Sequence, residues 1–179
     1  TTTNGTYMLR GNTNGQIAAM NGIIALSNAS TYGGVVLIYF ISDTSKSYRN
    51  LGSNNGSEGN WLGNIATRND YSGNNYSNVN GGNVLASIIS ENTKDVAMTV
   101  LPNAPIDVST GLPTPTIAVA TAGGTTIIKD NGKVTNYTDI QTEHVDIHPD
   151  GFMIDGVSGA TNDNFSFFDI NNPGANARL

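Results

Sequence analysis

Cysteine is absent from the 179 residues, and charged side chains make up only 12% of them. Without cysteine, the chain has no disulfides and no thiol nucleophile. Either its apolar core is large enough to stabilise the fold without disulfides, or the protein is assembled in a reducing compartment. The eight lysines and arginines do not cluster, and the formal net charge is −6, so we expect no nucleic-acid partner. The longest apolar run, residues 35–41, is much shorter than the ~20 residues of a membrane-spanning helix, so we expect no membrane partner.

Helical periodicity is also lacking, because the best candidate, residues 84–90, is short and fits a strand equally well. Asn and Gly form about a quarter of the chain, and both favour turns over helix interiors. The sequence begins with Thr1 rather than Met, so we expect a processed or excised piece of a longer protein. Short runs rich in Val, Ile, Thr, Phe and Tyr predict strands. The expected strands are residues 16–20, 23–27, 34–41, 45–49, 84–89, 95–101, 116–121, 125–129, 133–137, 144–148, 151–155 and 165–170.

The order of strands and turns repeats along the chain. An apolar strand, Gly33-Gly34, a second apolar strand and an Asp43 turn lead to a polar strand that ends at Tyr48. The same order recurs around Gly123-Gly124 and ends at Tyr137, and a looser copy covers residues 152–169. These offsets suit a repeat of ~40–45 residues, the length of a four-stranded propeller blade. The sequence therefore predicts an all-β fold of antiparallel β-meander repeats, a partial β-propeller of about three blades.

The repeats divide the chain into four expected segments. Residues 1–50 form a first blade-like repeat, residues 51–94 an Asn/Gly/Ser-rich insertion with a short strand, residues 95–140 a second repeat, and residues 141–179 a third, incomplete repeat. Within the insertion, residues 51–82 show no strand pattern. About three blades do not close a ring of four to eight, so we expect further repeats or other chains to complete it.

Two parts of the sequence carry a family resemblance. The first is DVAMTVLPNAPID at residues 95–107, followed by TGLP at 110–113, PTIAVAT at 115–121 and Gly123-Gly124. The second is MNGII at residues 20–24, with Gly33-Gly34 and FISD at 40–43. Together they resemble the propeller-like repeats of large virion-associated tail or appendage proteins of marine and freshwater tailed phages. The resemblance implies a virion protein assembled in the host cytoplasm, with other virion subunits or further repeats as partners, and no specific chemistry.

The segment His144-Val145-Asp146-Ile147-His148 carries the sharpest local pattern. On a strand, His144, Asp146 and His148 share one face, and two imidazoles with a carboxylate could hold a transition metal. The alternative is an outer strand with a polar solvent face, because same-face neighbours sit nearly 7 Å apart. Asp130-Asn131-Gly132 resembles part of a calcium loop but is more typical of a hairpin turn.

Three aromatic residues lie among the Asn, Gly and Ser of the insertion: Trp61, Tyr71 and Tyr76. Aromatic rings stack on sugar faces while neighbouring amides bond hydroxyl groups, so these residues are a candidate glycan-binding surface. The alternative is that Trp61 anchors the insertion on the edge of a blade.

These observations predict a non-enzymatic segment of a phage virion or tail appendage, structural or binding a host-surface glycan. We expect no cofactor and a homo-oligomer. One alternative is an extracellular adhesin or surface-layer repeat protein at the cell surface. The other is a glycan-degrading enzyme of the propeller type, for which the candidate paired carboxylates are Asp107, Glu143, Asp146 and Asp155.

Overall fold

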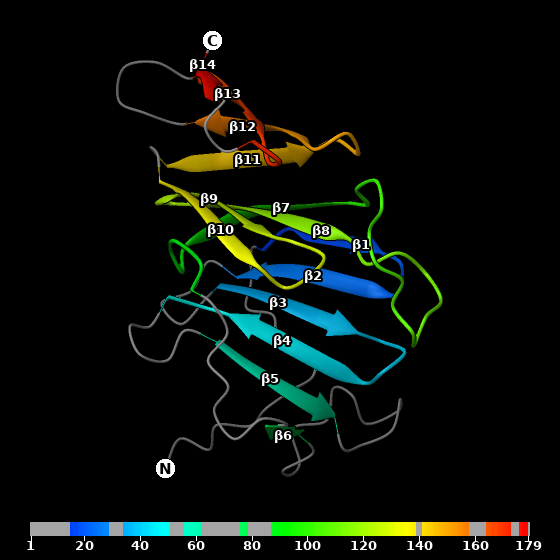
Figure 1. The fold of residues 1–179 in the computed structure, drawn as a ribbon. Coiled ribbons are helices and arrows are strands. Elements are labelled where there is room, and N and C mark those ends of the chain that lie inside the picture. Colours follow the sequence, from blue (N-terminus) through cyan, green and yellow to red (C-terminus); the bar gives the residue numbers. More distant parts are fainter. Residues whose placement is uncertain are drawn as a thin grey trace, which may run out of the picture.

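The computed structural model describes residues 15–28, 34–50, 56–61, 76–78, 87–138, 141–157, 164–172 and 176–178. Every regular element in these ranges is a β-strand, so the predicted all-β class is confirmed (Figure 1). No helix in this part of the chain is long and apolar enough to cross a membrane.

The strands form three antiparallel sheets in which neighbours follow one another along the chain. The first sheet contains β1 (Ile17–Met20), β2 (Ile23–Asn28), β3 (Gly34–Tyr39), β4 (Thr44–Tyr48), β5 (Gly56–Trp61) and β6 (Tyr76–Asn78). The second contains β7 (Thr93–Thr99), β8 (Thr116–Thr121), β9 (Gly124–Ile128) and β10 (Val134–Thr138). The third contains β11 (Thr142–Ile147), β12 (Phe152–Val157), β13 (Asn164–Asp169) and β14 (Asn176–Arg178). This arrangement is compatible with a partial β-propeller, as the sequence predicts.

Two glycines open the equivalent third strands of the first two sheets. Gly34 begins β3 with φ +106, and Gly124 begins β9 with φ +122. Both values lie in a region that side chains with a Cβ rarely adopt. One glycine of each Gly-Gly pair was expected to need positive φ, and this expectation is confirmed at Gly34 and Gly124. Gly33 lies outside the described residues.

The cross-strand register makes the internal repeat explicit. Tyr48 of β4 pairs with Val35, one residue after Gly34, and Tyr137 of β10 pairs with Thr125, one residue after Gly124. In the second and third sheets, the register of the first strand shifts by one residue at the same place, after Thr93 in β7 and after Thr142 in β11. The repeated order of apolar strand, glycine, apolar strand and tyrosine is therefore a repeat of structure.

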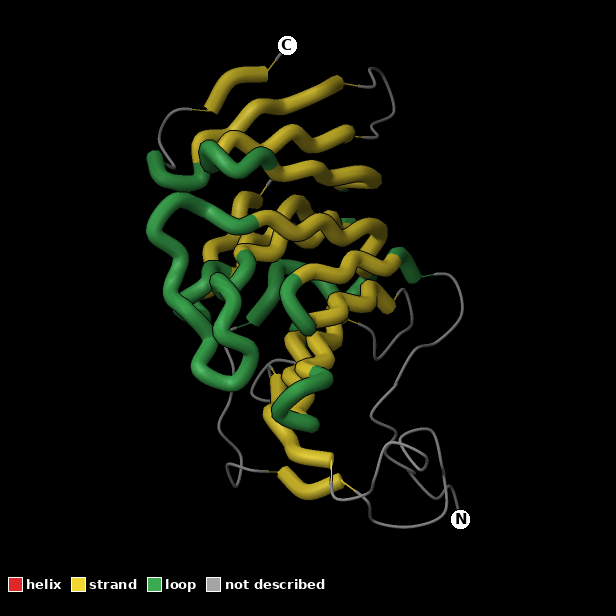
Figure 2. The backbone as a smooth tube through the Cα atoms, turned by 90° about the vertical axis from the view of Figure 1, so that its right-hand side faces the viewer, coloured by secondary structure: helices red, strands yellow, loops and turns green. Residues whose placement is uncertain are grey.

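The sheets pack face to face in chain order, and we call the face toward the following sheet the leading face and the opposite one the trailing face. The strand β7 is the first of the second sheet. It contacts β1 and β2 of the first sheet on one side and β11 of the third sheet on the other. In Figures 1 and 2 the first and third sheets extend away from the second in opposite directions. The first strands thus lie next to one another, as inner strands do around a propeller axis.

Alternating strand residues build one apolar core in each gap between sheets. The core between the first and second sheets is formed by Ile23, Ala25, Val35, Leu37, Tyr48, Ile88, Val96, Ile117, Val119 and Ile128. The core between the second and third sheets is formed by Ala118, Ala120, Ile127, Tyr137, Val145, Ile147, Met153, Phe168 and Ile170. Burial of this apolar surface is the main force that holds the sheets together.

Burial of the apolar strand residues differs in part from the sequence-based expectation. The apolar strand pattern predicts that Ile24, Leu26 and Phe167 are buried between blades, but each of these three is only partly buried. Ile24 and Leu26 lie beside buried Val36 and Ile38 on the trailing face of the first sheet. Phe167 lies on the leading face of the third sheet, as does its cross-strand partner Ile154. Within the described residues, no sheet precedes the trailing face of the first sheet, and none follows the leading face of the third.

Residues 51–82 of the insertion, expected to show no strand, contain two. The strand β5 pairs with β4, and β6 pairs with β5, so they extend the first sheet beyond its first four strands. The sequence of β5, Gly-Ser-Glu-Gly-Asn-Trp, has no apolar alternation, so the strand cannot be predicted from its side chains. It pairs with β4 through backbone hydrogen bonds. Residues 87–89, expected to belong to a strand at 84–89, lie outside regular strands, although Ile88 is buried in the first core. The third repeat, expected to be incomplete, has four strands.

Candidate functional site

A cleft of about 430 Å³ lies between the first and second sheets and is bordered by the loop of residues 102–115. Its floor consists of core side chains: Ile23, Leu37, Tyr48, Ile117 and Ile128. Its rim consists mainly of polar and charged side chains: Tyr39, Lys46, Asp107, Thr114, Lys129, Asp130 and Asn131. Binding sites commonly combine an apolar floor with a few polar groups that orient the ligand. This cleft is therefore our candidate site.

The loop of residues 102–115 is an ordered wall of the cleft. Its two arms are tied by backbone hydrogen bonds from Asp107 N to Leu112 O at 2.9 Å and from Thr114 N to Pro105 O at 2.7 Å. The side chain of Asn21, in the turn between β1 and β2, donates to the Pro113 carbonyl at 2.8 Å. The loop is thus anchored to the first sheet, and its rim residues are held in place.

Within this loop, Asp107 is fixed by its own turn. Its Oδ1 accepts hydrogen bonds from the Ser109 hydroxyl at 2.7 Å and from the Ser109 N–H at 2.8 Å. These hydrogen bonds, led by the one from the hydroxyl, lower the pKa of the Asp107 carboxyl below its usual value. Asp107 is therefore a carboxylate at neutral pH and offers hydrogen-bond acceptors to the cleft.

The facing wall comes from the first sheet. Tyr39 at the end of β3 and Lys46 in β4 line the cleft, and the Lys46 Nζ lies 5.6 Å from the centre of the Tyr39 ring. An ammonium group at this distance over an aromatic ring is held by a cation–π interaction. The pair provides an aromatic surface and a hydrogen-bond donor side by side.

The turn between β9 and β10 forms the third side. Residues 130–132 form the predicted hairpin turn, with Gly132 at φ +80 and the Asn131 side chain accepting from Lys133 N at 3.0 Å. The Lys129 ammonium donates to the Ile170 carbonyl of the third sheet at 3.2 Å. The rim therefore carries two ammonium groups and two carboxylates, Lys46 and Lys129 with Asp107 and Asp130. This balance suits a ligand without net charge.

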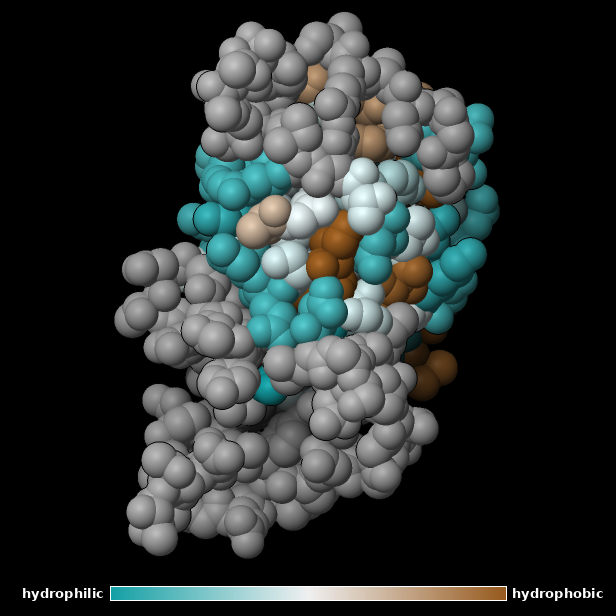
Figure 3. Space-filling view, turned by 90° about the vertical axis from the view of Figure 1, so that its left-hand side faces the viewer, coloured by the Kyte–Doolittle hydropathy of each residue, from teal (hydrophilic) through white to brown (hydrophobic). Residues whose placement is uncertain are grey.

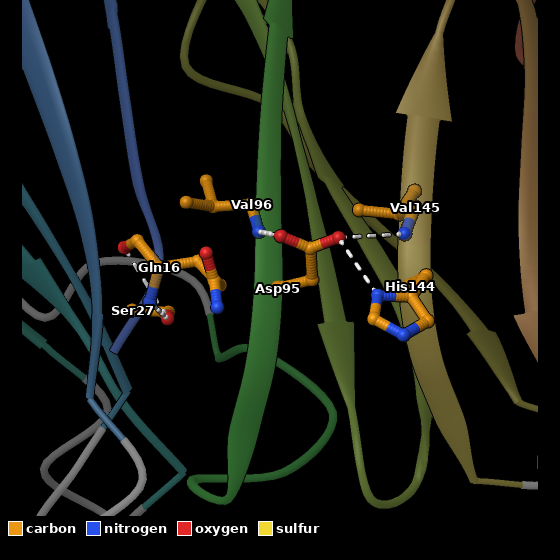
Figure 4. A network of polar contacts seen from close by, with 6 residues as sticks. All are labelled: Gln16, Ser27, Asp95, Val96, His144 and Val145. Carbon is orange, nitrogen blue, oxygen red and sulfur yellow. Dashed lines mark hydrogen bonds and ion pairs between the residues drawn. The ribbon is translucent and has the colours of Figure 1, made fainter. Parts of the chain in front are cut away.

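The strand predicted as a possible metal site has the expected alternation. His144, Asp146 and His148 are exposed, whereas Val145 and Ile147 are buried. However, each imidazole pairs with a different carboxylate: His144 Nδ1 lies 3.6 Å from Asp95 Oδ2 (Figure 4), and His148 Nδ1 lies 3.2 Å from Asp150 Oδ2. In the part of the chain that the structure describes, no three His, Cys, Asp or Glu side chains gather to hold a metal ion. The exposed face is polar, as in the alternative, but β11 is the inner first strand of its sheet and not an outer strand.

The aromatic candidates of the insertion are placed only in part. Trp61 ends β5 and Tyr76 begins β6, and their Cα atoms are partners in the register of these strands. Their side chains, and Tyr71 as a whole, lie outside the described residues. The role of these three aromatics in glycan binding stays a prediction.

The carboxylates considered for glycoside hydrolysis lie in different parts of the structure. Asp107 lines the cleft, Asp146 is exposed on the leading face of the third sheet, and Asp155 is buried between the second and third sheets. Glu143 lies 3.9 Å from Lys94. The structure therefore does not bring Asp107, Asp146 and Asp155 together at one site.

Asp155 is nonetheless unusual, because its carboxyl is 1% exposed. Its Oδ2 accepts a hydrogen bond from the Thr125 hydroxyl at 2.9 Å, and Thr125 is also 3.2 Å from the Thr142 hydroxyl. Burial raises the pKa of the Asp155 carboxyl, and the hydrogen bond from Thr125 only partly opposes this effect. The group is a buried polar link between two sheets.

No protein-family model matches the sequence, and neither curated proteins nor solved structures give a significant match. The functional argument therefore depends on the cleft itself. Sequence reasoning missed the rim residues Tyr39, Lys46 and Lys129, which are brought together only when the sheets stack. The available signals were the four prolines of residues 102–115 and the turn at 130–132, which the sequence does not link to each other.

Proposed function

We propose that this chain is a non-enzymatic segment of a phage virion or tail appendage, and that its cleft binds a glycan of the host surface. The observation that carries the binding role is the cleft between the first two sheets, with its apolar floor and its rim of Tyr39, Lys46, Asp107, Asp130 and Asn131. The virion context depends on the sequence resemblance alone.

Sugars suit this arrangement for chemical reasons. The C–H faces of a sugar ring pack on apolar and aromatic surface, while its hydroxyl groups both donate and accept hydrogen bonds. Carboxylates on the rim accept from hydroxyls and ammonium groups donate to them. Because the rim carries both signs equally and the chain has a net charge of −6, a neutral glycan fits better than an anionic one.

A glycan array with neutral and anionic oligosaccharides tests this function directly. The wild-type chain should bind neutral glycans, and Asp130→Ala and Tyr39→Ala should weaken that binding because both residues line the cleft. Asp150→Ala removes the same kind of charge at an exposed turn outside the cleft and should bind as the wild type does. Absence of glycan binding, or equal losses in Asp130→Ala and Asp150→Ala, would refute the cleft as a glycan site.

The two alternatives are separated by different measurements. A glycan-degrading enzyme would release reducing sugar from bound oligosaccharides, whereas the proposed binding segment leaves them intact. An adhesin or surface-layer protein would be encoded beside cell-surface genes, whereas the proposed appendage segment would be encoded beside virion genes.

A further inference from the structure

The two ends of the stack of sheets expose apolar side chains that are buried everywhere else in the repeat. On the side of the molecule shown in Figure 3, apolar residues form only small, separate areas between hydrophilic ones. By contrast, Ile17 on β1 is 67% exposed at one end of the stack, and Phe165 on β13 is 61% exposed at the other. Large exposed apolar groups of this kind mark contact surfaces.

The register assigns Ile17 an equivalent in each of the other sheets. Ile17 pairs with Leu26, Val96 pairs with Val119, and Val145 pairs with Asp155. Each partner belongs to the second strand of its sheet. It lies two residues before the residue that pairs with the first residue of the third strand, which is Gly34, Gly124 or Asn164. Ile17, Val96 and Val145 are therefore the same position of the repeat.

This position is an interface residue wherever a sheet precedes it. Val96 is 6% exposed because it packs against the leading face of the first sheet, and Val145 is 7% exposed because it packs against that of the second. Ile17 faces the same way from the first sheet, which has no preceding sheet within the described residues. Its exposure therefore marks an unfilled copy of an interface that the chain already forms twice.

The matching surface is the leading face of the third sheet. Ile154 occupies the position of Ala118, and Phe165 that of Thr125, by the same register. Ala118 and Thr125 are completely buried by the third sheet, whereas Phe152, Ile154 and Phe165 are exposed. Larger apolar side chains at positions that are covered in the other repeat indicate that another sheet covers this face too.

We propose that two copies of this chain associate head to tail, so that the leading face of the third sheet of each copy packs against β1 and β2 of the other. Each contact repeats the packing of β7 on the first sheet and of β11 on the second. Two copies contain six sheets, within the range of four to eight blades that closes a propeller ring.

The polar groups of the first strands fit the same arrangement. Gln16, Asp95 and His144 occupy one position in the three repeats and follow one another across the stack in Figure 4. At the existing interface, the carboxylate of Asp95 accepts a hydrogen bond from the backbone N–H of Val145 at 3.2 Å. In the proposed contact, His144 of one copy takes the place of Asp95 and faces Ile17 of the other. Because Val36 and Ile38 of β3 are already buried, the contact falls on the first two strands.

Light scattering coupled to size-exclusion chromatography tests the association. The wild-type chain should be a dimer, and Ile17→Lys and Phe165→Lys should each weaken dimerisation by roughly tenfold or more, as loss of a central apolar contact does. Both residues are exposed in the single chain, so circular dichroism should show an unchanged fold in the variants. Val108→Lys is the control, because Val108 is 99% exposed and lies at the cleft between the first and second sheets, on neither of the two proposed surfaces. A monomer at every concentration, or equal loss in the control, would overturn the proposal.

Disulfide trapping tests the head-to-tail geometry, because the chain has no cysteine of its own. Ile17→Cys and His144→Cys proteins, mixed and oxidised, should give a covalent dimer that contains one of each. Neither protein should cross-link to itself. Self-linked His144→Cys would show instead that two third sheets face each other. In the double variant Ile17→Cys/His144→Cys, a ladder of linked species larger than a dimer would show an open chain of copies. Either outcome contradicts the closed head-to-tail dimer, and neither bears on glycan binding.

Discussion

The hydroxyl of Thr125 in β9 donates a 2.9 Å hydrogen bond to Oδ2 of Asp155 in β12, and so links the second and third sheets inside their shared core. The same carboxyl has an oxygen, Oδ1, without a hydrogen-bond partner among the described residues. Burial without a full set of hydrogen bonds disfavours the ionised carboxylate relative to the same group in water. This relationship leads to the first prediction.

Asp155→Asn should remove a pH dependence of stability. Burial raises the pKa of Asp155 in the folded chain above its usual value of 3.8. The carboxyl therefore carries no ionisation penalty below pH ~4, and the folded state loses stability as pH rises through the raised pKa. Relative to Asp155→Asn, the wild-type free energy of unfolding should fall over that range. Urea denaturation at a series of pH values measures the difference, and parallel curves for the two proteins would contradict it.

Ile117→Ala should lower the free energy of unfolding by about 2–5 kcal/mol, because the side chain is 2% exposed between the first and second sheets. Ile41→Ala, at an exposed turn, should change stability by no more than ~0.5 kcal/mol. Chemical denaturation of both variants tests the assignment. A loss of less than ~1 kcal/mol for Ile117→Ala would mean that this site collapses around the missing atoms.

Gly34→Ala should be far more damaging than Gly111→Ala, although both glycines have positive φ. At Gly111 a new Cβ meets no atom within 4 Å, so only the backbone conformation is strained, at about 1 kcal/mol. At Gly34 the Cβ would collide with the backbone carbonyl of Tyr48, which pairing with β3 fixes in place. The loss should lie at the upper end of the usual ~0.5–3 kcal/mol for single substitutions. Equal thermal shifts in the two variants would show that β4 moves to accommodate the methyl group.

The sequence predicts the elements whose pattern is local. Strands around Ile117 and Ile127, the glycines at 34 and 124, and the alternation of His144 with Val145 all follow from side-chain periodicity and turn chemistry, and the structure has them. The strand β5 is not predictable in this way, because its Gly, Ser and Asn residues carry no apolar pattern and it pairs through its backbone.

Features that depend on contacts between sheets cannot be predicted from the sequence pattern either. Strand alternation alone gives Phe167 and Ile127 the same expected burial, yet Ile127 is covered by the third sheet and Phe167 has no following sheet among the described residues. The cleft shows the same limit. Lys46 and Asp130 are far apart in the chain, and only the packing of the first sheet on the second places them on one rim.

Asp95→Ala should loosen the contact between the first strands of the second and third sheets. Oδ1 of Asp95 accepts from Val96 N at 2.8 Å, while Oδ2 accepts from Val145 N of the neighbouring sheet at 3.2 Å (Figure 4). Removing the carboxylate leaves the Val145 N–H without this acceptor, which should lower stability by about 1–3 kcal/mol. The nearby His144 is largely exposed, so its ion pair with Asp95 should contribute little.

A comparison with Asp146→Ala isolates the contact between the sheets. Asp146 accepts from the N–H of the next residue, Ile147, at 2.8 Å, as Asp95 does from Val96, but it faces away from the second sheet. Both variants lose the bond within the strand, and only Asp95→Ala loses the bond to Val145. Hydrogen exchange at the Val145 amide, followed by NMR, should therefore accelerate in Asp95→Ala and stay close to wild type in Asp146→Ala. If the two variants exchange at the same rate, Asp95 stabilises only its own strand and adds nothing to the contact between the two sheets.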